Sequence, residues 1–291
     1  MSCFEAKKKV VKAKIVENTE IAKDIYKIVL RAKEVTNGAK AGQFVNVYLN
    51  NKSLLLPRPI SICELEGDNI TLVYGVVGQG TKELSSYTEG EEIKLSSANG
   101  NGFNLEDMDC VLSDNKDKVV LLVAGGIGVP PMLELAKTIR KKEDDEYKRN
   151  RIRLIAVIGF REEPFLQREL QNYCDKVYIA TDNGSVGFHG NVVKLIEKED
   201  IQIDYCYSCG PKVMLKALTN YCIEEKIQNK QKVIPLQVSM EERMGCGYGA
   251  CVGCICKIKE KDIENNCEKI VLKKVCKDGP VFFGNEVVFD E

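Results

Sequence analysis

The chain has 291 residues and a formal net charge of −1, with 44% hydrophobic and 29% charged residues. This length allows two or three domains with sizeable cores, and the near-zero charge gives no electrostatic reason to expect nucleic acid or an anionic membrane as a partner. No stretch approaches the roughly 18 uninterrupted apolar residues of a membrane span. His189 is the only histidine, which excludes a Rieske centre, a histidine-rich metal site and a Ser-His-Asp triad, and with them most hydrolases.

Residues 1–116 contain short apolar segments separated by turns that carry glycine. Candidate strands cover residues 25–30, 43–49, 70–74 and 92–95. Regularly spaced short strands are typical of an antiparallel barrel or sandwich. We therefore expect the first domain, residues 1–116, to be an antiparallel β domain.

Residues 117–236 alternate between strand and helix patterns. The continuous apolar run 119–124 is typical of a buried parallel strand. Further strands are expected at 153–158, 176–180 and 205–208, with helices at 131–140, 164–173, 192–199 and 213–225. This alternation predicts a doubly wound parallel sheet. Residues 237–291 are rich in glycine and cysteine and too few to form a core alone, so a bound metal group would have to stabilise them.

Two motifs in the β domain predict a nucleotide-binding site. Residues 58–61 (Arg-Pro-Ile-Ser) place a guanidinium and a hydroxyl, both good phosphate ligands, on either side of a rigid proline. Residues 78–81 (Gly-Gln-Gly-Thr) form a glycine-containing turn before a helix start, where backbone N–H groups favour a pyrophosphate. Each motif alone is also typical of a strand edge or a capped turn. Together in one β domain they favour a flavin nucleotide.

A third motif, Gly125-Gly126-Ile-Gly128, lies between the first strand and the first helix of the α/β domain. It departs from G-x-G-x-x-G because Pro131 stands where the last glycine would be, but the first βα turn still marks a nucleotide crevice. Asp182 follows a later strand, where a carboxylate would bind a free ribose 2′-OH and repel a 2′-phosphate. We therefore expect NAD(H) rather than NADP(H). A carboxylate that only caps a turn is the alternative.

Cys206 and Cys209 lie at the end of another predicted strand. A thioredoxin-like pair is one interpretation, but that motif belongs at a helix start, whereas Gly-Pro follows here. We expect Cys209 to act in catalysis as a small, soft side chain beside the nicotinamide ring. Cys206 is expected in the core, where reduced cysteine is common.

The most specific motif is Cys246-x4-Cys251-x2-Cys254, with further cysteines downstream. This spacing matches the plant-type [2Fe–2S] ligand run. The small residues in between let the backbone wrap closely and aim N–H groups at the sulfurs. Zinc also accepts four cysteines, but its sites favour two separated pairs. The odd total of 13 cysteines, their clustering and the lack of an apolar segment after the basic N-terminal residues indicate a reducing cytoplasm.

Taken in order, these motifs resemble the ferredoxin–NADP reductase superfamily. The C-terminal Cys-Lys-Asp-Gly-Pro-Val-Phe segment further resembles the electron-transfer subunits of class B dihydroorotate dehydrogenases. The resemblance implies an FAD-binding β-barrel, an NAD-binding α/β domain and a small [2Fe–2S] domain at residues 237–291. It implies FAD contacts from Arg58, Pro59, Ile60, Ser61, Val73, Tyr74, Gly75, Gly80 and Thr81. The implied cluster ligands are Cys246, Cys251, Cys254 and Cys276, which leaves Cys256 and Cys267 as spare thiols. Residues 257–274 form a longer segment than this family leads us to expect.

The resemblance also implies a partner, an FMN-containing catalytic subunit that oxidises dihydroorotate in pyrimidine biosynthesis, in a heterotetramer of two plus two chains. Electrons would pass from FMN through the cluster and FAD to NAD⁺. The nearest alternative is the small subunit of an NADH-dependent ferredoxin–NADP oxidoreductase or a sulfide dehydrogenase. A zinc-stabilised, non-catalytic nucleotide-binding module is the distant alternative.

Overall fold

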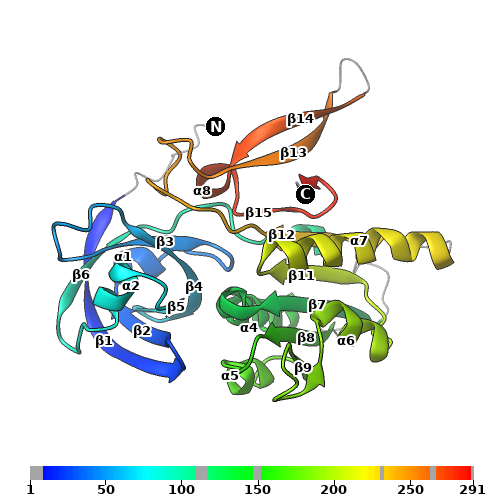
Figure 1. Cartoon of the computed structure of the whole chain (residues 1–291), viewed down its shortest axis with the longest axis horizontal. Helices are drawn as coiled ribbons and strands as arrows, with labels where there is room; N and C mark the ends of the chain where they lie inside the picture. Colours follow the sequence, from blue (N-terminus) through cyan, green and yellow to red (C-terminus); the bar gives the residue numbers. More distant parts are fainter. Residues whose placement is uncertain (1–8, 109–116, 147–151, 230–232, 263–266, 290–291) are drawn as a thin grey trace.

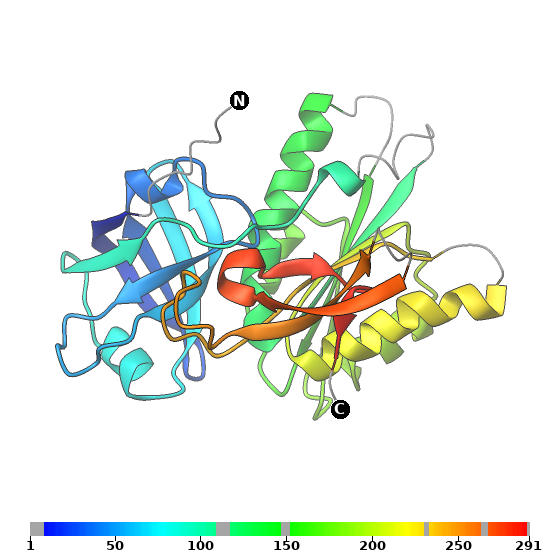
Figure 2. The same cartoon turned by 90° about the horizontal axis from the view of Figure 1, so that it is seen from above.

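The computed structural model describes residues 9–108, 117–146, 152–229, 233–262 and 267–289. Figure 1 shows a barrel of blue and cyan strands beside an α/β domain in green and yellow, with the C-terminal segment in orange and red above them. Seen from above, the orange and red segment lies over the line where the other two parts meet (Figure 2). The expected combination of a β domain and an α/β domain is confirmed.

The N-terminal part is a closed antiparallel barrel with strand order β1-β2-β5-β4-β3-β6. Its interior is filled by aliphatic side chains that alternate along the strands, such as Ile28, Leu30 and Leu72, as the period of two in a strand requires. Two short helices, α1 and α2, lie in its connections. The bounds are β1 Val10–Ala22, β2 Ile25–Arg31, α1 Lys33–Thr36, β3 Phe44–Tyr48, β4 Arg58–Glu66, β5 Asn69–Gly75, α2 Gln79–Leu84 and β6 Glu92–Ser96.

The second part is a sheet of order β10-β9-β8-β7-β11-β12-β15, in which only the β12–β15 pair is antiparallel. The chain reverses its direction of winding after β10, which gives the expected doubly wound topology. Its strands are β7 Lys118–Gly125, β8 Ile152–Phe160, β9 Lys176–Thr181, β10 Phe188–His189, β11 Tyr205–Cys209, β12 Leu236–Ser239 and β15 Val281–Phe283. Its helices are η1 Gly126–Gly128, α4 Pro130–Glu146, α5 Gln167–Gln171, α6 Val192–Lys198 and α7 Lys212–Asn229.

The sheet continues past the domain boundary that we expected between residues 236 and 237. That boundary falls inside β12, and β15 pairs with β12 on its outer edge through residues such as Val238 and Phe282. β12 is fully buried, so its backbone needs a hydrogen-bonding neighbour on both sides. The expected boundary between residues 116 and 117 adjoins residues 109–116, which lie outside the described residues.

The C-terminal part is built around a long hairpin. Strands β13 (Ile255–Asp262) and β14 (Cys267–Lys274) pair antiparallel, and β16 (Val287–Val288) adds to the other side of β13. The hairpin projects away from the body of the molecule (Figure 1) and leads into the short helix α8 (Val275–Asp278). The segment 257–274, which the sequence marked as long, is therefore this hairpin.

Some side chains of the barrel pack into a hydrophobic core of the α/β domain. Cys63 and Val73 from the barrel belong to the same buried cluster as α4 and β7. Beside it, Glu134 of α4 accepts a hydrogen bond from the Leu65 N–H at 2.8 Å, and Lys137 contacts Glu64 at 3.0 Å. Because buried polar groups need partners, these contacts fix α4 against β4. None of the helices in the described part of the chain is long and apolar enough to span a membrane.

Candidate functional site

The two motifs of the barrel lie against each other. Arg58 begins β4, and its guanidinium lies directly on the backbone of Gly80 in the first turn of α2, so that a Cβ at Gly80 would overlap it. Thr81 accepts hydrogen bonds from the N–H groups of Val77 and Gly78 at 2.9 and 3.2 Å, which fixes the turn. An arginine and a glycine-rich turn thus form one surface, and this arrangement suits a pyrophosphate.

The third barrel segment of the expected FAD site, residues 73–75, lies at the end of β5, which contacts η1 of the α/β domain. Val73 is buried between the two domains. The Tyr74 ring stacks on Tyr26, and its hydroxyl donates to Asn18 Oδ1 at 3.1 Å, so this hydroxyl is already used within the barrel. Burial raises the pKa of Tyr74. The glycine turn of the α/β domain therefore lies beside the barrel surface where the flavin is expected.

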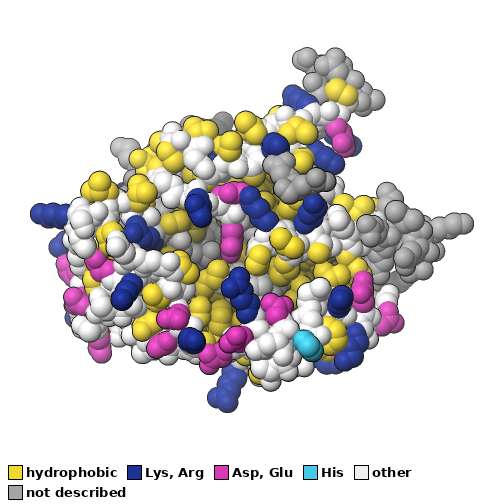
Figure 3. Space-filling view, viewed as in Figure 1, with side chains coloured by type: hydrophobic (Ala, Val, Ile, Leu, Met, Phe, Trp, Pro, Cys, Tyr) yellow, Lys and Arg dark blue, Asp and Glu magenta, His cyan; other side chains and the backbone are white. Residues whose placement is uncertain are grey.

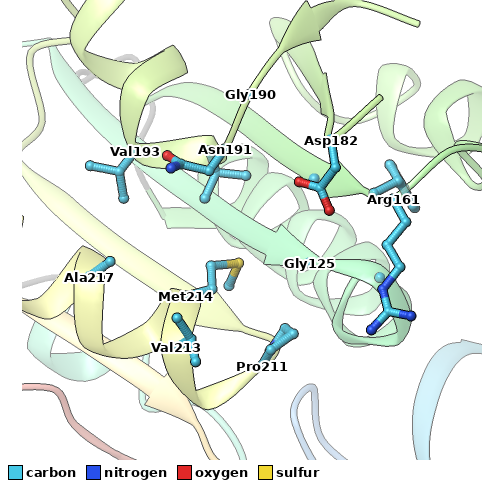
Figure 4. Close-up of a pocket in the computed structure, with 14 residues that line it drawn as sticks. Gly125, Arg161, Asp182, Gly190, Asn191, Val193, Pro211, Val213, Met214 and Ala217 are labelled. Atoms are coloured by element: carbon cyan, nitrogen blue, oxygen red, sulfur yellow. The ribbon is translucent and has the colours of Figure 1, made fainter. Parts of the chain in front are cut away.

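A cavity of about 400 Å³ opens at the carboxyl ends of β7, β8 and β9. Gly125 and Gly126 line it, and Figure 4 shows Pro211, Val213 and Met214 facing Asp182 across it. Ligands of doubly wound sheets bind at this edge. The structure thus brings together Gly125, Gly126 and Asp182 as the sequence predicted.

Sequence reasoning missed Arg161, which also lines the cavity. It follows the last residue of β8, and its side chain enters the cavity from the same side as the Asp182 carboxylate (Figure 4). The sequence did contain a pattern that could have identified Arg161: a basic residue directly after a buried parallel strand, which is where α/β sheets bind anionic ligands. Arg161 is a suitable ligand for a dinucleotide phosphate.

Gly128 and Cys209 are in direct contact. A Cβ at Gly128 would overlap the Cys209 carbonyl oxygen, so only glycine lets η1 approach β11 this closely. Burial, followed by the nearby Glu241 carboxylate, raises the pKa of the Cys209 thiol, which is therefore protonated at neutral pH. Burial also raises the pKa of Glu241. The sequence analysis missed Glu241 because it lies near Cys209 only through the pairing of Cys209 with Ser239 in the folded sheet.

Cys206 and Cys209 lie on opposite faces of the sheet. Cys206 packs in the core under α7, next to Cys222, whereas Cys209 belongs to the core on the other face. Residues three apart in a strand point in opposite directions. The thioredoxin-like interpretation is thereby excluded, and the core position expected for Cys206 is confirmed.

The loop that carries the first three cysteines of the motif wraps around the sulfur of Cys246. The N–H groups of Tyr248, Ala250 and Cys251 donate to Cys246 Sγ at 3.5, 3.3 and 3.4 Å. Desolvation alone would raise the pKa of this thiol, but the backbone hydrogen bonds and one from the Cys251 side chain lower it to about 6. The thiolate is the form of cysteine that binds metal, so the hydrogen bonds of this loop favour the metal-binding form of Cys246.

The hairpin β13–β14 brings the chain back to the cysteine loop. The Cys276 N–H donates to Cys254 Sγ at 3.4 Å, and the thiol of Cys276 is hydrogen-bonded to that of Cys254. Burial and this contact raise the pKa of Cys276 to about 12. The four sulfurs therefore form two pairs, Cys246 with Cys251 and Cys254 with Cys276.

These two pairs fit a [2Fe–2S] cluster, which takes two thiolates on each of two irons. The N–H groups aimed at Cys246 Sγ would stabilise negative charge on such a cluster. Among the described residues, no group of three or more cysteine, histidine or acidic side chains stands close enough together to hold a metal ion.

Of the two spare cysteines, Cys267 lies far from these pairs, whereas Cys256 is close to Cys254. Cys267 is exposed and begins β14 at the far end of the hairpin, about 23 Å along the strands from Ile255 at roughly 3.3 Å per residue. Cys256 lies in β13, where burial raises the pKa of its thiol to about 11. The geometry therefore favours Cys276 as the fourth thiol of the group.

Comparisons with known proteins agree with this architecture. A family model described as the iron–sulfur cluster binding domain of dihydroorotate dehydrogenase B matches residues 241–288, and the ferric reductase NAD binding domain matches residues 117–168. The structure of an NADH-dependent reduced ferredoxin–NADP oxidoreductase is similar over 96% of this chain and 90% of its own, with TM-score 0.74 and 25% identity. Phthalate dioxygenase reductase shares the fold over 90% of this chain and 76% of its own, with TM-score 0.54 and 20% identity. Fold and site define a pyridine-nucleotide reductase of the ferredoxin–NADP reductase type with an added iron–sulfur domain.

Proteins with similar sequences identify the family within this class. The electron-transfer subunit of dihydroorotate dehydrogenase B (NAD⁺) from Clostridium perfringens is 38% identical over 96% of this chain and 98% of its own length. The corresponding subunit from Fusobacterium nucleatum is 38% identical over 93% and 95%. The chain belongs to the family of dihydroorotate dehydrogenase B electron-transfer subunits.

The contact between Arg58 and Gly80 gives a first testable prediction. Gly80→Ala places a methyl group where the guanidinium lies, so Arg58 must move away from the expected pyrophosphate position. Losing one charge-assisted hydrogen bond weakens binding by about 1.5–3 kcal/mol, and we expect FAD affinity to fall at least about tenfold. Titration of the apoprotein with FAD measures this.

Glu89→Ala is the control. Glu89 is exposed and lies in the turn before β6, outside the Gly-Gln-Gly-Thr turn, so we expect wild-type FAD affinity. Equal affinity in the Gly80 and Glu89 variants would contradict the placement of Arg58 at the pyrophosphate.

Proposed function

We propose that the chain carries electrons between an FMN-containing catalytic subunit, which oxidises dihydroorotate, and NAD⁺, in pyrimidine biosynthesis. The observation that carries this proposal is the pairing of Cys254 with Cys276, next to a barrel and a nucleotide cavity in one body. The relatives that span nearly the whole chain are named for this activity. FAD, a [2Fe–2S] cluster and NAD(H) are the cofactors of the proposed function.

Each group supplies a different step: the cluster carries single electrons, a flavin handles one or two, and nicotinamide takes a hydride. This chain's residues bind and orient these groups. Cys246, Cys251, Cys254 and Cys276 would hold the irons, and the N–H groups aimed at Cys246 Sγ would stabilise negative charge there. Arg58 to Ser61, Val73 to Gly75, Gly80 and Thr81 would hold FAD.

On the nicotinamide side, the proposed contacts are Gly125, Gly126 and Gly128 for the phosphates and Asp182 for the ribose. Cys209 would pack beside the nicotinamide ring. Its protonated thiol is 3% exposed, so its role there is to exclude water and to orient the ring rather than to act as a nucleophile.

We propose that the partner subunit covers the cysteine loop. Tyr248 and Val252 are each 51% exposed, and Ile270 and Leu272 on the hairpin strand β14 are exposed as well. In Figure 3, hydrophobic side chains gather along the upper edge of the molecule, where Figure 1 places this loop and the base of the hairpin. Exposed apolar patches of this kind mark protein interfaces. A flavin in the partner could then approach the exposed Cys251.

The division into an FAD domain at residues 1–116, an NAD domain at 117–236 and a cluster domain at 237–291 is part of the same proposal, with β12 shared between the last two. We also propose a cytoplasmic location and a two-plus-two heterotetramer. The location is supported by the abundance of reduced cysteine, since buried thiols such as Cys63, Cys174 and Cys222 persist in reducing compartments.

The function is tested by assaying the chain with and without its partner. We expect the purified chain to oxidise NADH with artificial acceptors but to leave dihydroorotate unchanged. Together with the catalytic subunit it should reduce NAD⁺ with dihydroorotate. Dihydroorotate oxidation by the chain alone would contradict the subunit assignment, and NADH-dependent ferredoxin–NADP activity would favour the related oxidoreductase, whose structure is similar.

The ligand assignment predicts opposite results for two cysteine variants. Cys276→Ser removes one sulfur of the Cys254 pair, so we expect loss of the visible absorption of the cluster. Cys267 lies at the far end of the hairpin, so Cys267→Ser should keep the wild-type spectrum and two irons per chain. The reverse outcome would overturn the choice of Cys276.

The docking surface is tested by a charge on β14. Leu272 is 62% exposed, so Leu272→Glu should leave NADH oxidation by the chain unchanged. Desolvating a carboxylate in an apolar interface is unfavourable, and we expect affinity for the catalytic subunit to fall at least about tenfold, or ~1.4 kcal/mol. Isothermal titration calorimetry with the purified catalytic subunit measures this affinity. Val186→Glu, on an exposed residue after β9 at the sheet edge opposite to β15, is the control, and equal affinities in the two variants would contradict this surface.

A further inference from the structure

Asn46 connects the barrel to the cysteine loop. It lies in β3 directly opposite Pro59 of the Arg-Pro-Ile-Ser motif, so both side chains share one face of the barrel. The residue is 1% exposed. Its Nδ2 donates to the carbonyl oxygen of Cys246 at 3.1 Å. A single side chain thus bridges the strand next to the expected FAD motif and the first cysteine of the expected cluster.

The contact is closer than one hydrogen bond requires. Gly247, at φ +70°, lies so close to the Asn46 side chain that a Cβ added at Gly247 would overlap the Asn46 carboxamide. Figures 1 and 2 both show the orange loop lying against the barrel next to β3. The path of the loop as it leaves Cys246 is therefore set by the surface of the barrel.

Asn46 is itself held in place. Its backbone N–H donates to Ser96 Oγ at 2.9 Å, and Asn99 Nδ2 donates to the same oxygen at 2.8 Å. Its Oδ1, however, is buried with no hydrogen-bond partner among the described residues. An unpaired buried acceptor destabilises a protein by about 1–3 kcal/mol, so stability alone does not explain an asparagine at this position.

We propose that Asn46 is a positioning residue that fixes the environment of the cluster relative to FAD; this inference rests on Cys246 being a cluster ligand. By binding the Cys246 carbonyl, Asn46 sets the direction in which the loop continues. The following residues Tyr248, Ala250 and Cys251 then point their N–H groups at Cys246 Sγ. Hydrogen bonds to cluster sulfurs tune the reduction potential, so the barrel adjusts the potential of the cluster through this amide.

The test compares Asn46→Asp and Asn46→Ala in the anaerobically purified, cofactor-loaded protein. Asn46→Asp replaces the N–H donor with a carboxylate oxygen facing the Cys246 carbonyl. The added negative charge disfavours reduction. We expect the ratio of reduced to oxidised cluster at a fixed potential to fall about tenfold, equivalent to about 59 mV for a one-electron couple. Asn46→Ala should change the EPR g-values of the reduced cluster, with FAD content unchanged in both.

Asn69→Asp is the matched control, because Asn69 also has a buried, unpartnered Oδ1 but lies at the opposite end of β5 from Gly75. It should leave the potential and the EPR spectrum as in wild type. Wild-type values in both Asn46 variants, or equal shifts in the Asn46 and Asn69 variants, would overturn the inference. If Asn46→Asp does not fold, the EPR spectrum of Asn46→Ala decides. A wild-type protein without a cluster, or a Cys246→Ser variant with a wild-type spectrum, would instead refute the ligand assignment.

Discussion

The hydrogen bond from the Cys276 N–H to Cys254 Sγ closes the structure on which the function depends. It joins a cysteine of the tight loop to one that arrives after the whole length of the β13–β14 hairpin. Both residues are fully buried, in a core that also includes Phe44 of the barrel and Met240 after β12. The C-terminal segment therefore has no separate core, and the position of its four thiols is fixed by packing on the other two domains.

This packing puts the expected redox sites in an order that suits electron transfer. The cysteine loop rests on β3 through Asn46, and β4, which pairs with β3, carries Arg58. The end of β5 contacts η1, whose Gly128 in turn contacts Cys209. The proposed cluster, flavin and nicotinamide sites therefore follow one another, with each step between neighbouring elements. Because the bound groups carry the redox chemistry, the contribution of the protein is to hold them in fixed positions next to one another.

Much of this was predictable from the sequence, and the rest was not for physical reasons. The parallel strands β7, β8, β9 and β11 were predicted because they carry nearly continuous apolar runs, as in residues 119–124, whereas the short parallel strands β10 and β12 were not predicted. The cysteine loop was predicted because its ligands are close in sequence. Arg161 was missed although it directly follows a predicted strand. Glu241 and Asn46 were missed because their positions depend on pairings between distant strands, Cys209 with Ser239 and Asn46 with Pro59. The hairpin β13–β14 was seen only as added length, because its strands carry many lysines and alternate weakly.

We propose that Cys246, Cys251, Cys254 and Cys276 hold a [2Fe–2S] cluster that exchanges electrons with an FAD bound to the same chain. The most direct measurement is metal and sulfide analysis of the anaerobically purified protein, with its spectrum recorded before and after NADH is added. The account predicts two irons and two acid-labile sulfides per chain, and bleaching of both flavin and cluster absorption by NADH. One zinc ion per chain, or a cluster that NADH leaves oxidised while the flavin bleaches, would contradict it.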